Sequence, residues 1–167
     1  MKIVEYDEVD PLGVLHLNLL SLGYALTPEK VALIRRLDPR PFPFLAVYAV
    51  EEGVVAGQVG VYRLPMVSTQ GREEVGGICA VCTHPAFSKR GVATALLEEA
   101  HSRMRRAGLR FSTLGTARHR VAHALYLRQG YEEVVAFTSA FAASAVIGAT
   151  AGLRAEMAGP QRLHLAE

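Results

Sequence analysis

The sequence predicts an α+β or α/β fold with a central mixed sheet, mostly antiparallel and flanked by helices. Three observations support this. The chain of 167 residues suits one domain, and half of it is apolar, so it can bury a sizeable core. The expected elements run in the order strand, two helices, three strands, and then alternating helix and strand. No internal repeat interrupts that order.

The first part of the chain is expected to form a strand and two helices. Residues 2–6 are predicted to be a short strand. Leucines recur at helical spacing in residues 11–21 and Gly23 follows them, which predicts a helix. Thr27 is a capping residue directly before Pro28, so a second helix should begin there and stop before Pro39. The stretch 39–44 is rich in proline and must be a loop.

The remaining elements follow from turn residues and apolar periodicity. Gly53 lies in the turn of a predicted hairpin, and the helices should end at Gly108 and Gly130. The predicted strands are 45–50, 54–62, 74–83, 109–114 and 131–138, and the predicted helices are 91–106 and 120–129.

Charge and composition exclude some functions. A net charge of +2 is too small to indicate nucleic-acid binding, so any anion site must be local. The basic residues are almost all arginine, and Asn18 is the only asparagine, a bias that suits a hot habitat or a GC-rich genome. The N-terminus is acidic where a secretory signal would be apolar, so a cytoplasmic location is expected.

Cys79 and Cys82 form a C-x-x-C pattern inside a predicted strand. The pattern invites a redox or metal interpretation, but their odd spacing is expected to point them to opposite faces of the sheet. No second cysteine pair completes a zinc site, so no metal is predicted. Two ordinary strand cysteines in a reducing compartment are the favoured interpretation.

Residues 134–153 contain no charged side chain and are long enough to span a bilayer. They consist mostly of Ala, Ser, Thr and Gly, whose insertion is barely favourable. No membrane association is therefore expected, and a buried strand followed by a helix of small residues is the favoured interpretation. A domain anchored to a membrane by this segment is the alternative.

A loop between a strand and a helix combines features of a phosphate site. Unpaired amides at the helix start, a glycine without a side chain, and nearby hydroxyl and cationic groups all favour an anion. The residues are Ser88, Lys89, Arg90, Gly91, Val92, Ala93 and Thr94. The nucleoside-triphosphatase and Rossmann phosphate patterns are both missing. An ordinary turn with exposed cations remains the alternative.

Three motifs together resemble the GNAT acetyltransferase superfamily. T-H-P-A-F-S-K-R-G-V-A-T-A-L-L, which begins at Thr83, is similar to its acyl-CoA-binding motif. A-L-Y-L-R-Q-G-Y, which ends at Tyr131, is similar to its later tyrosine motif, and E-E-G-V-V-A-G resembles its preceding hairpin. The resemblance covers residues 1–138, the expected domain. Residues 139–167 depart from it as an Ala-rich extension, which is open to interpretation as an added helix, a dimer contact or a swapped element.

The resemblance implies an N-acetyltransferase that moves an acetyl group from acetyl-CoA to a primary amine in a ternary complex. It places the pantetheine arm beside a strand that splays from its neighbour, near Val81 and Thr83, with the diphosphate on the loop at Gly91. The acceptor would be a small molecule or a peptide, and a homodimer is a further expectation. Two positions depart from the family pattern: Ser88 replaces Arg or Gln, and His119 replaces an Asn that contacts the pantetheine.

The resemblance also suggests catalytic residues. Tyr126 matches the family's general acid, which protonates the leaving thiolate, and the alternative is a core tyrosine on the inner face of a helix. Glu74 is favoured over Glu73 as the general base, and a solvated strand edge is the alternative.

Histidines are further candidates for groups that titrate near neutral pH, namely His84, His119 and His123. His101 is expected to be exposed to solvent. A different class of function, a CoA-binding regulatory or scaffold module without chemistry, also fits the two departures.

Overall fold

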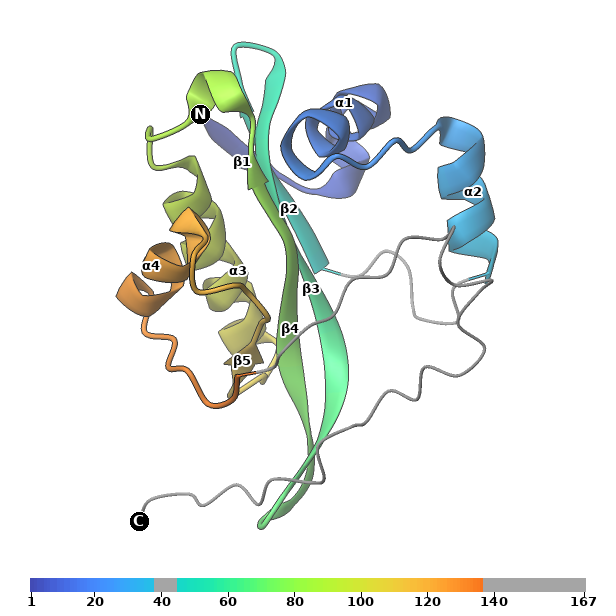
Figure 1. Ribbon diagram of the computed structural model, residues 1–167. Coiled ribbons are helices and arrows are strands. Elements are labelled where there is room, and N and C mark those ends of the chain that lie inside the picture. The colour runs from blue at the N-terminus through green and yellow to red at the C-terminus, as the bar shows by residue number, and fades with distance from the viewer. Residues whose placement is uncertain (38–44, 137–167) are drawn as a thin grey trace, which may run out of the picture. The chain divides into compact units, whose positions relative to one another are not determined.

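The structure, a computed structural model, describes residues 1–37 and 45–136 (Figure 1). Residues Met1–Tyr131 form one compact unit. The predicted loop 39–44, the extension 139–167 and the expected domain boundary at residue 138 lie outside the described residues. So does most of the uncharged segment 134–153.

The unit is built on a mixed sheet with the strand order β1-β2-β3-β4-β5. Its strands are β1 (Lys2–Val4), β2 (Leu45–Glu51), β3 (Val54–Ser68), β4 (Gly71–Thr83) and β5 (Ser112–Thr113). The first three pairings are antiparallel, and β5 runs parallel to β4. The predicted fold class, a mixed and mostly antiparallel sheet flanked by helices, is confirmed.

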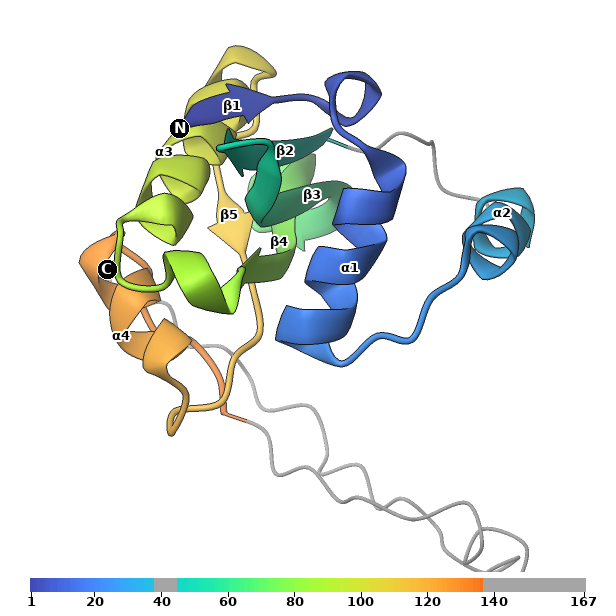
Figure 2. The same ribbon diagram turned by 90° about the horizontal axis from the view of Figure 1, so that it is seen from above.

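Four helices accompany the sheet in the described part of the chain: α1 (Pro11–Leu22), α2 (Pro28–Leu37), α3 (Val92–Arg106) and α4 (Val121–Arg128). Viewed from above, α1 covers one face of the sheet, and α3 and α4 lie on the other (Figure 2). One core cluster, the α3-side core, contains Val59, Leu96, Leu97, Met104, Tyr126 and their buried neighbours. The second, the α1-side core, contains Val4, Leu17, Tyr48, Val55, Cys82 and their neighbours.

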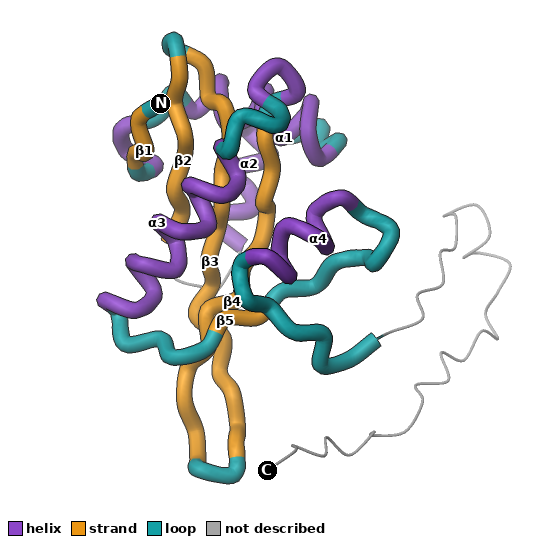
Figure 3. The backbone as a smooth tube through the Cα atoms, turned by 90° about the vertical axis from the view of Figure 1, so that its left-hand side faces the viewer, coloured by secondary structure: helices purple, strands orange, loops and turns teal. Residues whose placement is uncertain are grey.

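The central hairpin is longer than predicted. β3 continues to Ser68 and β4 begins at Gly71, so the two strands form a ribbon that extends beyond the helices (Figure 3). Pro65 lies inside this ribbon, opposite Glu74. Among the described residues, β2 pairs with β3 as far as Val61, so the ribbon part of β3 has one edge beyond this ladder. A proline can occupy such an edge because no ladder hydrogen bond is lost there.

β1 ends at Val4, where the prediction extended the strand to residue 6, and two later strands are also shorter than predicted. β5 contains only Ser112 and Thr113, not the whole of 109–114. The predicted strand 131–138 is wrong over 131–136, where the chain has no regular secondary structure, and its last two residues are not described. Both later segments mix apolar with charged residues, and each follows a glycine with positive φ, Gly108 or Gly130, where the chain turns out of its helix.

A β-bulge in β4 changes the expected orientation of the two cysteines. Gly60 pairs with Cys79 and Gln58 with Cys82, so the single residue Val59 lies opposite two residues of β4. Ala80, within the bulge, has φ 49°. Because β4 has one extra residue between the two cysteines, their side chains point to the same face of the sheet despite the odd spacing. This is the face that α1 covers. The prediction of opposite faces is therefore wrong, although both thiols are free as expected.

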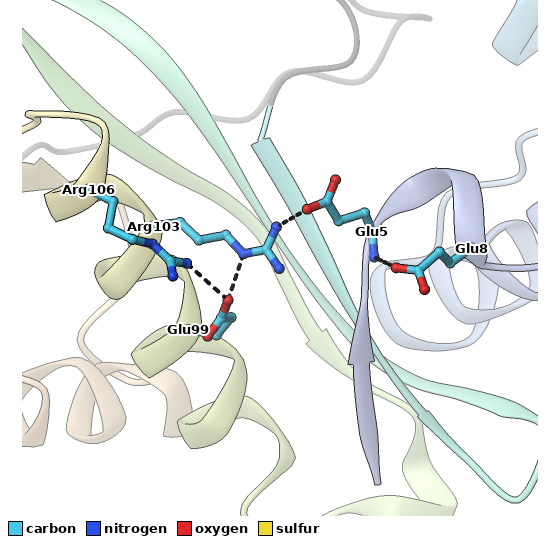
Figure 4. Close-up of polar contacts among 5 residues, drawn as sticks. All are labelled: Glu5, Glu8, Glu99, Arg103 and Arg106. Carbon is cyan, nitrogen blue, oxygen red and sulfur yellow. Dashed lines mark hydrogen bonds and ion pairs between the residues drawn. The ribbon is translucent and has the colours of Figure 1, made fainter.

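Ionic contacts connect α3 to the segment after β1. Arg103 pairs with Glu5 and also donates from Nε to Glu99 Oε1 at 2.7 Å (Figure 4). Arg106 lies 3.5 Å from the same Glu99 oxygen. The Glu5 amide in turn donates to the Glu8 carboxylate, so the contacts run from α3 to the turn that precedes α1.

Candidate active site

The edge of β4 opens over its last residues. β5 pairs with β4 only at Gly76 and Gly77, and beyond them the described chain adds no further strand pairing on that side. The side chains of Cys79, Ala80 and Val81 are accordingly only half-buried, although they belong to a central strand of the sheet. An unpaired strand edge of this kind can accept an extended ligand through main-chain hydrogen bonds.

The residues expected to flank the pantetheine differ in their surroundings. Val81 packs against the α3-side core, so its side chain is directed into the protein. The carbonyl oxygen of Thr83 accepts a hydrogen bond from Ser21 Oγ of α1 at 3.0 Å. The end of β4 is therefore held from the α1 side while its outer edge stays open.

The start of α3 has the geometry of an anion site. Lys89 and Gly91 both have positive φ, 61° and 80°, which turns the loop sharply into the helix. No side chain of the described residues caps this terminus, and the first helical hydrogen bond runs from Ala95 N to Gly91 O. The N–H groups of Val92, Ala93 and Thr94 precede that bond and are available to a ligand. A Cβ at Gly91 would meet nothing within 4 Å, so the approach is open.

The side chains of the loop contribute unequally. Ser88, Lys89 and Arg90 are all exposed. The Arg90 guanidinium lies 5.2 Å from the centre of the Phe87 ring and 3.4 Å from a Glu51 carboxylate oxygen. Val92, by contrast, is 2% exposed and packs in the core, so it can offer only its amide.

Tyr126 of α4 belongs to the α3-side core, with 8% of its surface exposed. Its ring packs edge-to-face on that of Tyr131, with 5.8 Å between the centroids. Burial, helped by the nearby Tyr131, raises the pKa of its phenol. The core location that the sequence offered as the alternative is what the structure has, and the acid role stays a prediction.

The two glutamates proposed as the base lie inside β4, on opposite faces. Glu74 shares its face with Gly76, where a Cβ would meet Met104 of α3. Its carboxylate pairs with Arg63 at 3.0 Å and is half-exposed. Glu73, on the other face, accepts a hydrogen bond from Ser68. Glu74 precedes the bulge at Ala80 by six residues, about 20 Å of extended strand.

The histidines are spread over several elements. His119 is exposed in the turn before α4. His84 Nδ1 accepts a hydrogen bond from the Ala86 amide at 3.2 Å, directly after β4. His123 lies on α4, three residues before Tyr126. The loop 88–94 follows the open end of β4 directly in the chain. Glu74 lies near the other end of β4, apart from both.

The model of the acetyltransferase (GNAT) family matches residues 14–131, well over half of the chain. The chain belongs to the GNAT acetyltransferase family. The match includes the open strand edge, the uncapped helix start and Tyr126. No curated protein sequence matches it as a relative.

Solved structures share the GNAT fold of this chain. It is similar to a transcriptional regulator from Bacillus halodurans C-125, with TM-score 0.68, 19% identity, and coverage of 84% of this chain and 98% of that one. An acetyltransferase from Trypanosoma brucei has TM-score 0.65 and 18% identity, covering 84% and 99%. An aminoglycoside antibiotic 6'-N-acetyltransferase from Acinetobacter haemolyticus has TM-score 0.59 and 18% identity, covering 85% and 100%.

Sequence reasoning missed a polar cluster beside Tyr126 of this GNAT protein. His101, expected to be exposed, is half-buried, and its Nε2 lies 2.8 Å from the Tyr131 hydroxyl. The prediction for His101 is wrong because the residue lies on the core-facing side of α3, four residues after buried Leu97 and three before buried Met104. That spacing is visible in the sequence and could have revealed its position.

Two further properties concern only residues 1–37 and 45–136 of the GNAT chain. No group of three His, Cys, Asp or Glu side chains there is arranged to hold a metal ion. None of the helices in these ranges is both long and apolar enough to cross a membrane.

Proposed function

We propose that the protein transfers an acetyl group from acetyl-CoA to the primary amine of an acceptor by direct attack in a ternary complex. The observation that carries the proposal is the continuity of two features. The open edge of β4 ends at Thr83, and the uncapped start of α3 follows eight residues later at Gly91. A ligand with an extended arm and a diphosphate fits that sequence of sites.

The donor site would use mainly backbone groups. The amides of Val92, Ala93 and Thr94 would bind the diphosphate, helped by the helix dipole. Ser88, Lys89 and Arg90 are exposed beside them and would add hydroxyl and cationic groups. A main-chain N–H near the bulge in β4 would polarise the thioester carbonyl, as in an oxyanion hole. His119 would add a polar contact to the pantetheine.

Tyr126 would supply the proton for the departing thiolate. A free thiol has a pKa of about 8.5 and a phenol about 10, so the phenol is protonated at neutral pH. Burial raises the pKa of Tyr126 further, which keeps its phenol protonated at neutral pH. This is the protonation state that a general acid needs.

The acceptor amine must lose a proton before it can attack. Glu74 is our candidate base, but about 20 Å of strand separates it from the bulge, which is too far for one bridging water, so a chain of several waters would have to carry the proton. Its ion pair with Arg63 at 3.0 Å would have to open first. A small-molecule or peptide amine is proposed as the acceptor, and the cytoplasmic location and a homodimer remain predictions.

The proposal is tested in two steps with the full chain. Isothermal titration with acetyl-CoA should release heat of binding, and thiol release should then depend on an amine. The acceptor panel should contain amino acids, polyamines, peptide N-termini and aminoglycosides. Binding without thiol release from any acceptor would replace the proposal with a silent CoA-binding module, and no binding would exclude both.

A further inference from the structure

We infer that Tyr131 is a positioning residue for Tyr126, and that His101 and Ser112 hold Tyr131 in place. The inference deepens the proposed function, since it concerns the residue that would protonate the thiolate. It depends on one arrangement of backbone hydrogen bonds and on one cluster of hydroxyl and imidazole groups.

The end of α4 is a Schellman motif that joins Tyr126 to Tyr131 directly. Gly130 has φ 85°, its N–H donates to Leu127 O at 3.1 Å, and the Tyr131 N–H donates to Tyr126 O at 3.1 Å. These are the two hydrogen bonds of that motif, in which the residue after the glycine also packs on the residue it bonds. The edge-to-face contact of the two tyrosine rings is this side-chain contact. Movement of Tyr131 must therefore displace Tyr126.

The Tyr131 hydroxyl is held by two other elements. It lies 2.8 Å from His101 Nε2 of α3 and is hydrogen-bonded to Ser112 Oγ of β5. A phenol has one proton to donate and can also accept, so it can satisfy both partners at once. All three side chains are half-buried, which limits competition from water. Tyr131 therefore has its backbone fixed by α4 and its hydroxyl fixed by α3 and β5.

This arrangement links the two halves of the proposed site. The first turn of α3 contains the amides proposed for the diphosphate, and His101 lies further along the same helix. A shift of α3 would be transmitted through His101 and Tyr131 to Tyr126. Removal of the hydroxyl should therefore impair proton transfer without weakening donor binding.

The direct test is Tyr131→Phe, which keeps the ring contact and the Schellman motif but deletes the hydroxyl. We expect kcat to fall about tenfold or more, because the change removes the hydrogen bonds of the hydroxyl to both His101 and Ser112. The KM for acetyl-CoA should stay within about twofold, because the amides at the start of α3 are unaffected. Tyr48→Phe is the matched control, since Tyr48 is a buried tyrosine of the α1-side core. It should leave kcat unchanged. An unchanged kcat in Tyr131→Phe, or an equal fall in Tyr48→Phe, would overturn the inference.

A double-mutant cycle tests the role of His101. His101→Leu should reproduce part of the loss seen in Tyr131→Phe, because the bond to Ser112 remains, and His101→Gln, which can still hydrogen-bond, should lose less. Because Tyr131→Phe already removes the hydrogen bond to His101, the double variant that combines His101→Leu with Tyr131→Phe should be no worse than Tyr131→Phe alone. Fully additive losses would contradict the arrangement.

Ring-labelled tyrosine NMR separates this inference from the proposed function. The Tyr126 resonance should shift in Tyr131→Phe and in His101→Leu, and should stay in place in Tyr48→Phe. This readout needs no turnover, so an inactive wild-type protein would remove the proposed function and leave the inference supported by the shifts. A Tyr126 resonance that shifts in neither Tyr131→Phe nor His101→Leu would contradict the inference.

Discussion

The side-chain amides of Asn18 and Gln58 exchange two hydrogen bonds, of 3.1 and 3.0 Å, in the buried layer between α1 and β3. Asn18 also donates to the carbonyl of Val14 at 2.8 Å, one turn earlier on the helix. Gln58 pairs with Cys82 across the β-bulge of β4. The amide pair therefore fixes α1 against the sheet beside the bulge.

Breaking this pair from one side should destabilise the protein more than removing both partners. Asn18→Leu leaves the buried Gln58 amide without its partner and should cost about 1–3 kcal/mol of the free energy of unfolding. Replacing both residues with leucine removes the unsatisfied group, so the loss should be smaller than for Asn18→Leu alone. Urea unfolding of the two single variants and the double variant measures this. A double variant as unstable as the sum of the two single variants would refute the expectation.

Gly91→Ala should weaken acetyl-CoA binding by about tenfold or more. The residue has φ 80°, and a side chain there costs about 1–2 kcal/mol of backbone strain, which would shift the loop and its amides. Gly108→Ala is the matched control at the other end of α3, with φ 77° and equally open space. It should lose similar stability but keep the wild-type Kd in calorimetry. Equal losses of affinity in both variants would mean that the loop has no special role.

Several helix ends of this chain could be predicted from local chemistry because a proline or a glycine marks them. Pro28 opens α2, and Gly23 and Gly130 end α1 and α4 with positive φ, as their positions in the sequence indicate. The limits of the strands could not be predicted in the same way. β5 is short because it pairs with β4 at two residues only, a tertiary property that no local pattern records.

The parts of the candidate active site that depend on local backbone conformation could be predicted from the sequence. The parts that depend on tertiary packing could not. The glycine and the helix start at Gly91 follow from residue type alone. The bulge at Ala80 has no signature in the sequence, since alanine rarely has positive φ. It reversed the expected face of Cys79 relative to Cys82. The contact between His101 and Tyr131 joins residues thirty positions apart, so it depends on the fold.

His101 should make the protein less stable at mildly acidic pH. Burial lowers the pKa of its imidazole in the folded state, and Arg105 nearby adds to this while Glu98 opposes it. The unfolded chain therefore takes up a proton first as the pH falls below about 6.5, and stability is lost from there down to the folded pKa. Thermal unfolding of wild type should lose more between pH 7 and pH 5 than His101→Gln does. Parallel curves for the two proteins would contradict this.

Tyr126→Phe should lower kcat about 10²- to 10⁴-fold, the range for loss of a general acid, and leave the Kd for acetyl-CoA nearly unchanged. The ring stays in the α3-side core and keeps its contact with Tyr131, so the fold should survive. The size of the loss should depend on the leaving group, because an acyl donor whose thiol is more acidic needs less help from an acid. Steady-state rates with acetyl-CoA and with an acetyl thioester of a more acidic thiol measure this. A defect of the same size with both donors would mean that Tyr126 supports the structure of the site and gives no proton.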